Sequence, residues 1–165
     1  MPDGSTHAAA SVLIAWSPWT IWMVNNVRPV FFTVTTEAAV LFSYGALAGI
    51  LISPDLDLED RTLSKGIVWR SSCLVGAIWS ILWWPYSQVV YHRSILSHGP
   101  IIGTLLRLVY LVGVPLLVWT LLARAFGWPP PNASPVVWWL EHPGRWCVIG
   151  LALSDAAHWA MDQLF

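Results

Sequence analysis

Four long apolar segments constrain this chain more than any other feature of its sequence. They cover residues 7–24, 37–53, 101–123 and 146–165, and a helix needs about 20 apolar residues to cross a bilayer. Only 10% of the residues are charged, against roughly 25% in an average soluble domain. We therefore predict a single integral membrane domain over residues 1–165: an all-α, polytopic helical bundle with about four spanning helices.

Two details of these segments bear on their shape and packing. Pro18 lies inside the first segment and predicts a bend in that helix. Gly45 and Gly49 lie four residues apart in the second segment. Small residues at this spacing let two membrane helices approach closely, so the second helix is expected to have a tightly packed neighbour.

The segment 66–91 is long enough to cross the membrane but carries Arg70, Ser71 and Ser72 near its start. A full crossing would leave the candidate ligands before it and those after it on opposite sides of the bilayer. Polar residues near the start also fit an incomplete crossing better than a complete one. We therefore expect 66–91 to be re-entrant, turning at the "WWP" of residues 83–85, or to lie in the interface.

Charge, cysteine content and the N-terminus exclude several classes of protein. A net charge of −1 gives no general attraction to nucleic acid, which is not an expected partner. Cys73 and Cys147 are too few for a disulfide framework and too far apart for a zinc knuckle. The N-terminus "MPDGSTH" lacks the basic region of a cleavable signal peptide, so the first apolar segment is expected to be retained.

Ionisable residues gather at four points beside or inside the apolar segments, and such residues usually mark function in membrane proteins. His7 opens the first segment, "SPDLD" closes the second, "HRSILSH" precedes the third, and "SDAAHWAMD" lies in the last. Imidazole and carboxylate groups together suit Zn²⁺, Mn²⁺ or Fe²⁺. A simple polar helix start is the alternative for His7. His142, in a Pro-rich loop, is interpreted as a surface residue.

Two prolines define the local geometry of the middle groups. Pro54 stops the second helix, and alternation in an extended run after it would place Asp55 and Asp57 on the same side. A solvated turn is the alternative for these two aspartates. Pro100 fits the first turn of the next helix, which puts His98 at the mouth of that helix.

The last group has helical spacing. Asp155, His158 and Asp162 lie at i, i+3 and i+7, within about 60° on one face of a helix. Three ionisable groups on one face of a spanning helix need partners, and a metal ion would supply one. The alternative is an ion pair, in which Arg107 of the third apolar segment neutralises Asp155.

These motifs also carry a resemblance. "LISPDLD", "WWPY…HRSILSHGPIIGTLLRLVYL" and "SDAAHWAMD" resemble a family of small membrane proteins of unknown function, found largely in cyanobacteria, for which metal binding has been suggested. More loosely, the order His…PDxD…HRSxxSH…HxxxD is similar to the YdjM-like inner-membrane metal-dependent hydrolases. Those are distantly similar to zinc-dependent phospholipase C and the S1/P1 nucleases. The resemblance implies seven metal ligands: His7, Asp55, Asp57, His92, His98, His158 and Asp162. Asp155 is added as a further candidate because it lies on the same helical face as His158 and Asp162.

The ligand set and the resemblance together predict a metal-dependent hydrolase of a phosphoester, with membrane lipid around it and a lipid-like substrate entering from the bilayer. One or two divalent ions are the expected cofactors, Zn²⁺ first, with Mn²⁺ or Fe²⁺ as alternatives. Asp57 and Arg93 are the predicted catalytic residues, with Arg93 neutralising phosphate charge. Ser94 and Ser97 are expected to orient ligands or substrate.

A second class of function stays open: a non-catalytic subunit or assembly factor of a larger membrane protein complex, with a structural metal. A structural site is closed by protein ligands, whereas a catalytic one keeps an open position. A metal transporter fits less well, because the ligands gather at one surface and not at mid-bilayer. The expected location is a bacterial inner or thylakoid-type membrane, with the site on the cytoplasmic side, where positive residues are slightly more numerous.

Overall fold

The computed structural model describes residues 4–27, 34–58, 62–92 and 94–164, and this part of the chain is all-helical. The all-α prediction is therefore confirmed for the described residues. The helices, in chain order, are α1 (Gly4–Val27), α2 (Thr36–Ala48), the 3₁₀ helix η1 (Pro54–Asp57), α3 (Leu63–Ser71), α4 (Cys73–Val89), α5 (Ile95–His98), α6 (Ile102–Phe126), α7 (Ser134–Glu141) and α8 (Gly144–Leu164).

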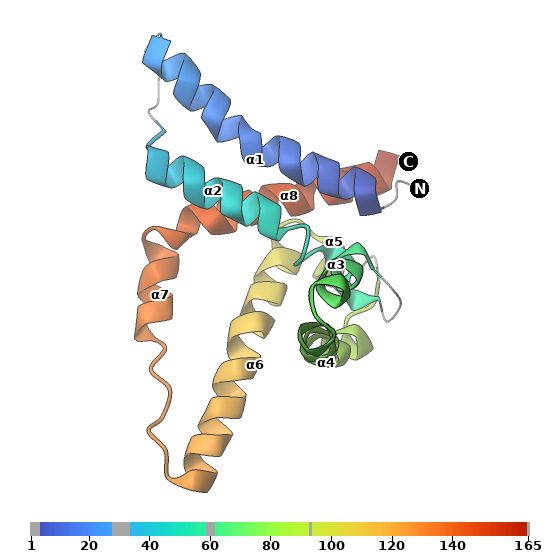
Figure 1. Ribbon diagram of the computed structural model, residues 1–165, viewed down its shortest axis with the longest axis vertical. Helices are drawn as coiled ribbons and strands as arrows, with labels where there is room; N and C mark the ends of the chain where they lie inside the picture. Colours follow the sequence, from blue (N-terminus) through green and yellow to red (C-terminus); the bar gives the residue numbers. More distant parts are fainter. Residues whose placement is uncertain (1–3, 28–33, 59–61, 93, 165) are drawn as a thin grey trace.

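Three helices form the packed part of the molecule. α2 packs against both α1 and α8, and α1 also contacts α8. The N-terminus and the C-terminus therefore lie close together at one end of this layer, whereas α6 runs away from it (Figure 1). The end of the layer that holds both termini is also the end where α5, η1 and the start of α6 meet it.

Glycines allow the close contact between α2 and α8. A Cβ atom on Gly45 would lie 1.8 Å from the carbonyl oxygen of Cys147, and one on Gly150 would lie 2.1 Å from that of Phe42. Gly49 faces the side chain of Ser154 in the same way. The sequence predicted a tightly packed neighbour at Gly45 and Gly49, and the structure identifies that neighbour as α8.

Replacing Gly45 with alanine is expected to lower the melting temperature of the purified protein. The new methyl group would clash with the backbone of α8, which cannot move aside as a side chain can. Overpacking of this kind lowers the free energy of unfolding by about 1–3 kcal/mol. Gly66→Ala is the matched control, because a Cβ there meets nothing within 4 Å and helix propensity favours alanine. Thermal unfolding followed by circular dichroism measures both variants, and equal melting temperatures would contradict the close packing.

The segment 66–91 turns back on itself, but not where the sequence predicted. α3 ends at Ser71 and α4 begins at Cys73, and the two helices pack against each other as a hairpin. The Trp79 indole donates to the Ser64 hydroxyl across this pair (3.2 Å). The turn at Ser72 replaces the predicted one at residues 83–85, because the helix continues through Pro85 to Val89.

The "WWP" region instead belongs to the core. Trp83 is fully buried and packs with Leu56 of η1 and Tyr86 of α4. Its ring also stacks on Tyr110 of α6, with centroids 5.4 Å apart. Burial of this aromatic group holds the second half of α4 against η1 and α6, which fixes the chain just before His92.

The prediction of four spanning helices is not supported by the structure. Among the described residues, one helix, α6, is both long and apolar enough to cross a membrane, which is weak support for membrane insertion by itself. α2 has only 13 residues and α4 only 17, short of the length a crossing needs. In α8 the polar residues after Leu153 interrupt the apolar run.

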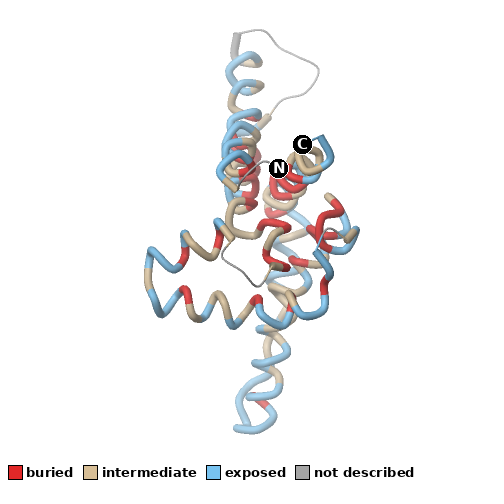
Figure 2. Tube along the Cα trace, turned by 90° about the vertical axis from the view of Figure 1, so that its right-hand side faces the viewer, coloured by how far each residue is buried: buried red, intermediate tan, exposed pale blue. Residues whose placement is uncertain are grey.

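α6 is also poorly covered by the rest of the protein along its far half. Apolar side chains are exposed around it, among them Leu105, Val109, Leu117 and Leu121, and its far half is drawn mostly in the exposed colour (Figure 2). It ends at Gly127, whose left-handed conformation (φ 68°) lets the Trp128 amide donate back to the Ala123 carbonyl. Its first two turns, by contrast, contact α5 and α8.

Candidate metal centre

Six of the predicted ligands come together at the end of the helical layer where the termini meet. They lie on five segments of the chain: the start of α1, η1, the loop after α4, the end of α5 and the last turns of α8. We call them the His–Asp cluster: His7, Asp55, His92, His98, His158 and Asp162.

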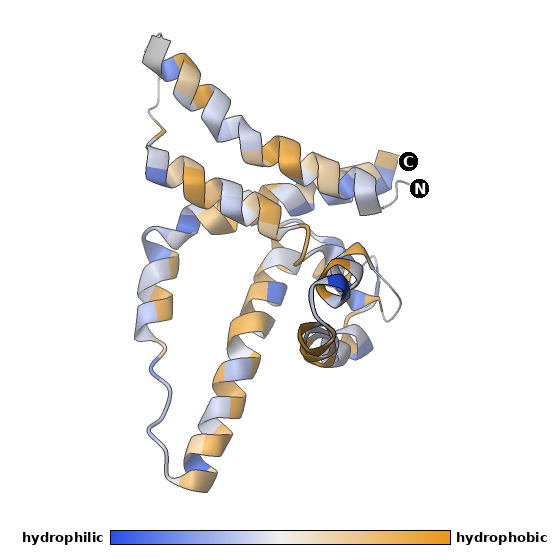
Figure 3. Ribbon diagram, viewed as in Figure 1, coloured by the Kyte–Doolittle hydropathy of each residue, from blue (hydrophilic) through white to orange (hydrophobic). Residues whose placement is uncertain are grey.

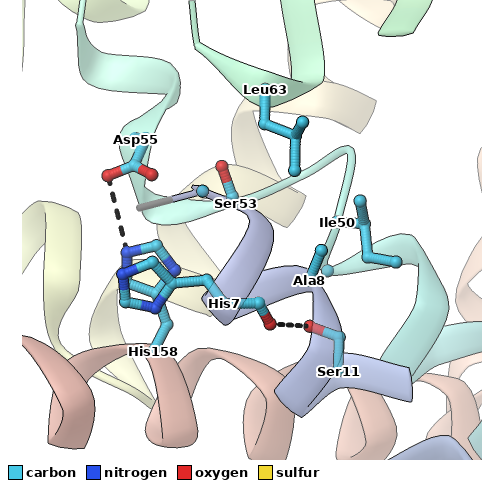
Figure 4. Close-up of a pocket in the computed structure, with 10 residues that line it drawn as sticks. His7, Ala8, Ser11, Ile50, Ser53, Asp55, Leu63 and His158 are labelled. Carbon is cyan, nitrogen blue, oxygen red and sulfur yellow. Dashed lines mark hydrogen bonds and ion pairs between the residues drawn. The ribbon is translucent and has the colours of Figure 1, made fainter. Parts of the chain in front are cut away.

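Local sequence places two of these segments. Ser53 and Pro54 start η1 directly after the turn that ends α2, which carries Asp55 toward α8. Ser94 caps α5, with its hydroxyl accepting from the Ser97 amide, so that the short helix ends with His98 pointing inward. Figure 4 shows Asp55 facing the stacked rings of His7 and His158.

Four donor atoms form a closed ring at the centre of the cluster. Asp55 Oδ1 lies 3.5 Å from His158 Nε2 and 3.8 Å from His98 Nε2. Asp162 Oδ2 lies 3.4 Å from His158 Nε2 and 3.5 Å from His98 Nε2. Ligands about 2.0–2.2 Å from a tetrahedral Zn²⁺ are about 3.3–3.6 Å from one another. The spacing of these four atoms therefore fits a divalent metal ion.

Two further histidines flank this ring on opposite sides. The His7 ring stacks on His158 with centroids 3.7 Å apart, and its Nε2 lies 3.4 Å from Asp162 Oδ1. The His92 ring meets His98 edge to face, with centroids 4.8 Å apart. Two groups of three ligands result, each with ligand atoms within 4.8 Å of one another: His7, His158 and Asp162, and Asp55, His92 and His98. Each group contributes two of the four atoms of the central ring.

Two buried nitrogens without hydrogen-bond partners fit the role of metal ligands. Nε2 of His98 and Nε2 of His158 are both buried, and neither has a hydrogen-bond partner among the described residues. A buried polar atom left unpaired costs roughly 1–3 kcal/mol. Both nitrogens belong to the central ring, so an ion bound there would satisfy both of them.

A hydrogen-bond chain sets the tautomer of His98. The Ser97 hydroxyl donates to Asp57 Oδ2 and lies 2.6 Å from His98 Nδ1. Because the single hydroxyl proton goes to the carboxylate, Nδ1 of His98 must carry the proton of the second bond. Nε2 is then left with a free lone pair directed at the ring, as a metal ligand requires.

Asp57, which the sequence predicts as a direct ligand, lies outside the His–Asp cluster. Both of its oxygens are engaged elsewhere: Oδ2 accepts from Ser97, and Oδ1 lies 2.9 Å from His92 Nδ1. The reason is that residues 54–57 form a 3₁₀ turn and not an extended run. With three residues per turn, Asp55 and Asp57 point in different directions, and Asp57 orients two of the histidines.

Asp155 is likewise held by the protein. Its Oδ2 accepts from Arg107 Nη2 and from the Thr104 hydroxyl, and all three residues are buried. Arg107 Nη1 also donates to the Ser97 carbonyl (2.7 Å). The ion-pair alternative thus describes Asp155 better than the ligand prediction, and Arg107 ties together α5, α6 and α8.

The electrostatics of the cluster keep Asp55 ionised. Burial by itself opposes the charged form, but the His158 and His98 rings beside the carboxylate outweigh it and hold the pKa of Asp55 well below its usual range. A carboxylate is the form that binds a metal ion, so this residue is ready for ligation at any ordinary pH.

A small cavity opens beside the cluster, between the start of α1 and the end of α2. It has a volume of about 20 Å³ and is lined by His7, Asp55 and His158 together with Ser11 and Ser53 (Figure 4). That volume is enough for a single water molecule with several polar partners.

Other residues of the site were predicted in part. Arg93, a predicted catalytic residue, lies outside the described residues. The hydrogen bond between the Ser11 and Ser154 hydroxyls (2.7 Å), which joins α1 to α8, was not predicted from the sequence. The signal was present in the spacing, since each serine lies one helical turn from a cluster histidine.

Fold and site together define a helical protein with a buried histidine–aspartate centre suited to a divalent metal ion. In agreement with this, a family model described as uncharacterized metal-binding protein (DUF2227) matches residues 2–165, and the chain belongs to that family. No curated protein and no solved structure matches the chain. The wider resemblance to YdjM-like hydrolases and phospholipase C is therefore without support from these comparisons.

Proposed function

We propose that this chain is a membrane-anchored hydrolase that cleaves phosphoesters with the help of one or two divalent metal ions, Zn²⁺ before Mn²⁺ or Fe²⁺. The observation behind the proposal is the ring of Asp55, His98, His158 and Asp162, whose two imidazole nitrogens are buried without partners. These four residues would hold the first ion, with His7 and His92 available on either side for it or for a second.

A bound ion of this kind supplies a Lewis acid and an activated water at neutral pH. The protein supplies position and charge. The hydrogen-bond chain from Asp57 through Ser97 holds the His98 ring in one tautomer, and Asp57 also orients His92. The cavity beside His7 offers room for one water next to Asp55 and His158.

An accessible edge supports a catalytic role over a closed structural site. The side chain of His98 is 4% exposed, but those of Asp55 and His92 are 26% and 33% exposed. Substrate would approach at this edge, because the small cavity has no room for a phosphoester. Arg93 directly follows His92 in the sequence and is proposed to neutralise the phosphate charge there.

The membrane anchor in this proposal is α6. It is 25 residues long, apolar and exposed along most of its length, and a helix that is apolar all round is stable in lipid. When α6 crosses the bilayer with its N-terminal end at the surface, the His–Asp cluster lies just outside the hydrocarbon layer. The bacterial inner or thylakoid-type membrane and the cytoplasmic side remain part of the proposal.

A structural role in a larger membrane complex is the second candidate. The exposed apolar side chains of several helices favour it, because such surfaces mark contacts with proteins or lipid. In that case the ion would be retained without any turnover.

Turnover by metal-loaded protein tests the proposal. We expect the protein in detergent to hydrolyse bis(4-nitrophenyl) phosphate after Zn²⁺ or Mn²⁺ loading, and to lose this activity with a chelator or on His158→Ala. His142→Ala is the matched control, since His142 stacks on Trp138 in an exposed segment away from the cluster. Turnover that persists without metal would refute the proposal, and stoichiometric metal without phosphoester turnover would favour the structural role.

A further inference from the structure

α4 has two different faces. The face toward the rest of the protein is buried and includes Gly76, Trp83 and Tyr86. The opposite face is apolar and exposed, and its residues follow one another at helical spacing. Its members are between 58 and 76% exposed: Leu74, Ile78, Ile81, Trp84 and Val89. We call these five residues the outer face of α4.

No charged residue interrupts this face. α4 contains no Asp, Glu, Lys or Arg over its 17 residues, and it is drawn predominantly in the hydrophobic colour (Figure 3). The apolar surface continues past the end of the helix through Tyr91, Ile95 and Ile101, which are 69 to 86% exposed. Polar residues, among them His92 and Ser94, separate these three from one another in the sequence, and exposed apolar surface of this extent usually has a partner.

The direction of α4 relative to α6 indicates which partner. α4 is seen end-on in Figure 1, whereas α6 runs down the plane of the same view. After a turn of 90° the hairpin runs across the view while α6 still runs downward (Figure 2). α3 lies on the side of α4 away from the far end of α6, so the outer face of α4 is on the side toward which α6 projects.

Length and charge exclude insertion of the hairpin tip first. At 1.5 Å per residue α4 measures about 25 Å, less than the roughly 30 Å of a hydrocarbon core. The hairpin turn carries the exposed Arg70 and the polar Ser71 and Ser72, which are costly inside hydrocarbon. Trp84, on the outer face, is a residue typical of the membrane interface.

We propose that the outer face of α4 lies on a lipid bilayer, parallel to its plane, while α6 crosses that bilayer. This inference rests on the membrane anchor of the proposed function and goes beyond it by assigning the hairpin to the headgroup layer. His92, part of the accessible edge of the His–Asp cluster, closely follows α4, whereas Asp55 lies on η1, which packs on the buried face of α4 at Trp83. The centre therefore approaches the headgroup layer at His92, and phospholipid headgroups are the phosphoesters within its reach.

Depth-dependent fluorescence quenching tests the placement. Single cysteines replace Leu74, Ile81 or Val89 in a background without Cys73 and Cys147, and a fourth labels Leu117 in the middle of α6. The labelled full-length protein is reconstituted in phosphatidylcholine–phosphatidylglycerol vesicles that contain lipids spin-labelled at defined depths. We expect the three α4 labels at one common depth, about 5–10 Å into the headgroup–acyl boundary, and the α6 label close to the bilayer centre.

Each other outcome overturns the inference in a distinguishable way. A steady decrease in depth from position 74 to position 89 would mean insertion by the tip. α4 labels quenched by aqueous iodide, with the α6 label still deep, would leave the anchor intact but remove α4 from the membrane. α4 labels shielded from both lipid and iodide, with energy transfer between copies, would mean a contact with a second chain. An α6 label open to iodide would refute the anchor together with this inference, whereas metal content would be unaffected.

Discussion

Replacing His98 or His158 with alanine is expected to abolish stoichiometric metal binding. Each imidazole supplies one of the two buried Nε2 atoms of the central ring. Without it, the remaining ligands cannot complete the coordination of a four-coordinate ion. Elemental analysis of the dialysed, detergent-solubilised protein measures the effect directly. His142→Ala, which removes an exposed histidine outside the cluster, is expected to keep the wild-type metal content.

A further variant and a chelator distinguish loss of metal binding from loss of folding. Ser97→Ala keeps all six cluster residues but removes the bond that fixes the His98 tautomer, and losses of such supporting bonds typically cost 10- to 100-fold in metal affinity. At a free metal concentration 100 times the Kd, bound metal stabilises the wild-type protein by about 2.7 kcal/mol, and a chelator should remove that stabilisation. The chelator should not change the melting temperature of His98→Ala. Full metal content in both histidine variants would contradict the assignment of the ring.

Replacing Arg107 with alanine is expected to destabilise the protein more than Gly45→Ala or the loss of any single cluster histidine. It leaves the buried carboxylate of Asp155 without its counter-charge, and breaking a buried ion pair from one side costs about 3–5 kcal/mol. For a chain of this length that corresponds to a fall in melting temperature of roughly 6–20 °C. Arg124→Ala, an exposed arginine of the same helix, is the control and should remain within about 0.5 kcal/mol of the wild type.

A double variant separates the ion pair from simple packing. Arg107→Met combined with Asp155→Leu removes both charges together, and buried pairs replaced by apolar groups of similar volume are often neutral in stability. We therefore expect the double variant to be more stable than Arg107→Ala, although the Ser97 carbonyl still loses its donor. Metal affinity should fall in both, because Arg107 joins α5 and α8, which carry His98 and His158. A loss of stability in the double variant equal to the sum of the losses in the two single variants would contradict the ion-pair account.

Much of the candidate site follows from sequence because its residues occur in short local motifs. The spacing of His158 and Asp162 in "SDAAHWAMD" places both side chains on one helical face whatever the rest of the fold does. The polar groups beside apolar segments also indicated where the ligands would be found. Arg107 as a partner for Asp155 was a sequence alternative, since a buried cation needs a buried anion.

Other features depended on contacts that no local pattern encodes. The position of Asp57 beside His92 and Ser97 depends on a 3₁₀ turn and on Ser97 itself, which approaches from 40 residues away. The hairpin turn at Ser72 and the burial of Trp83 follow from packing of α4 against α3, η1 and α6, and a proline at position 85 did not end the helix.

The sequence by itself determined the helical class, the residue types of a metal centre and the segments that carry them, because helical periodicity and side-chain chemistry are local properties. The tertiary structure decided which six of the eight candidate ligands meet in the His–Asp cluster, which hydrogen bonds and ion pair the other two make, and where the short helices turn. Those outcomes depend on distances between atoms far apart in the chain, and the packing of α1, α2 and α5 on α8, of η1 on α4 and α5, and of α5 on α6 sets those distances.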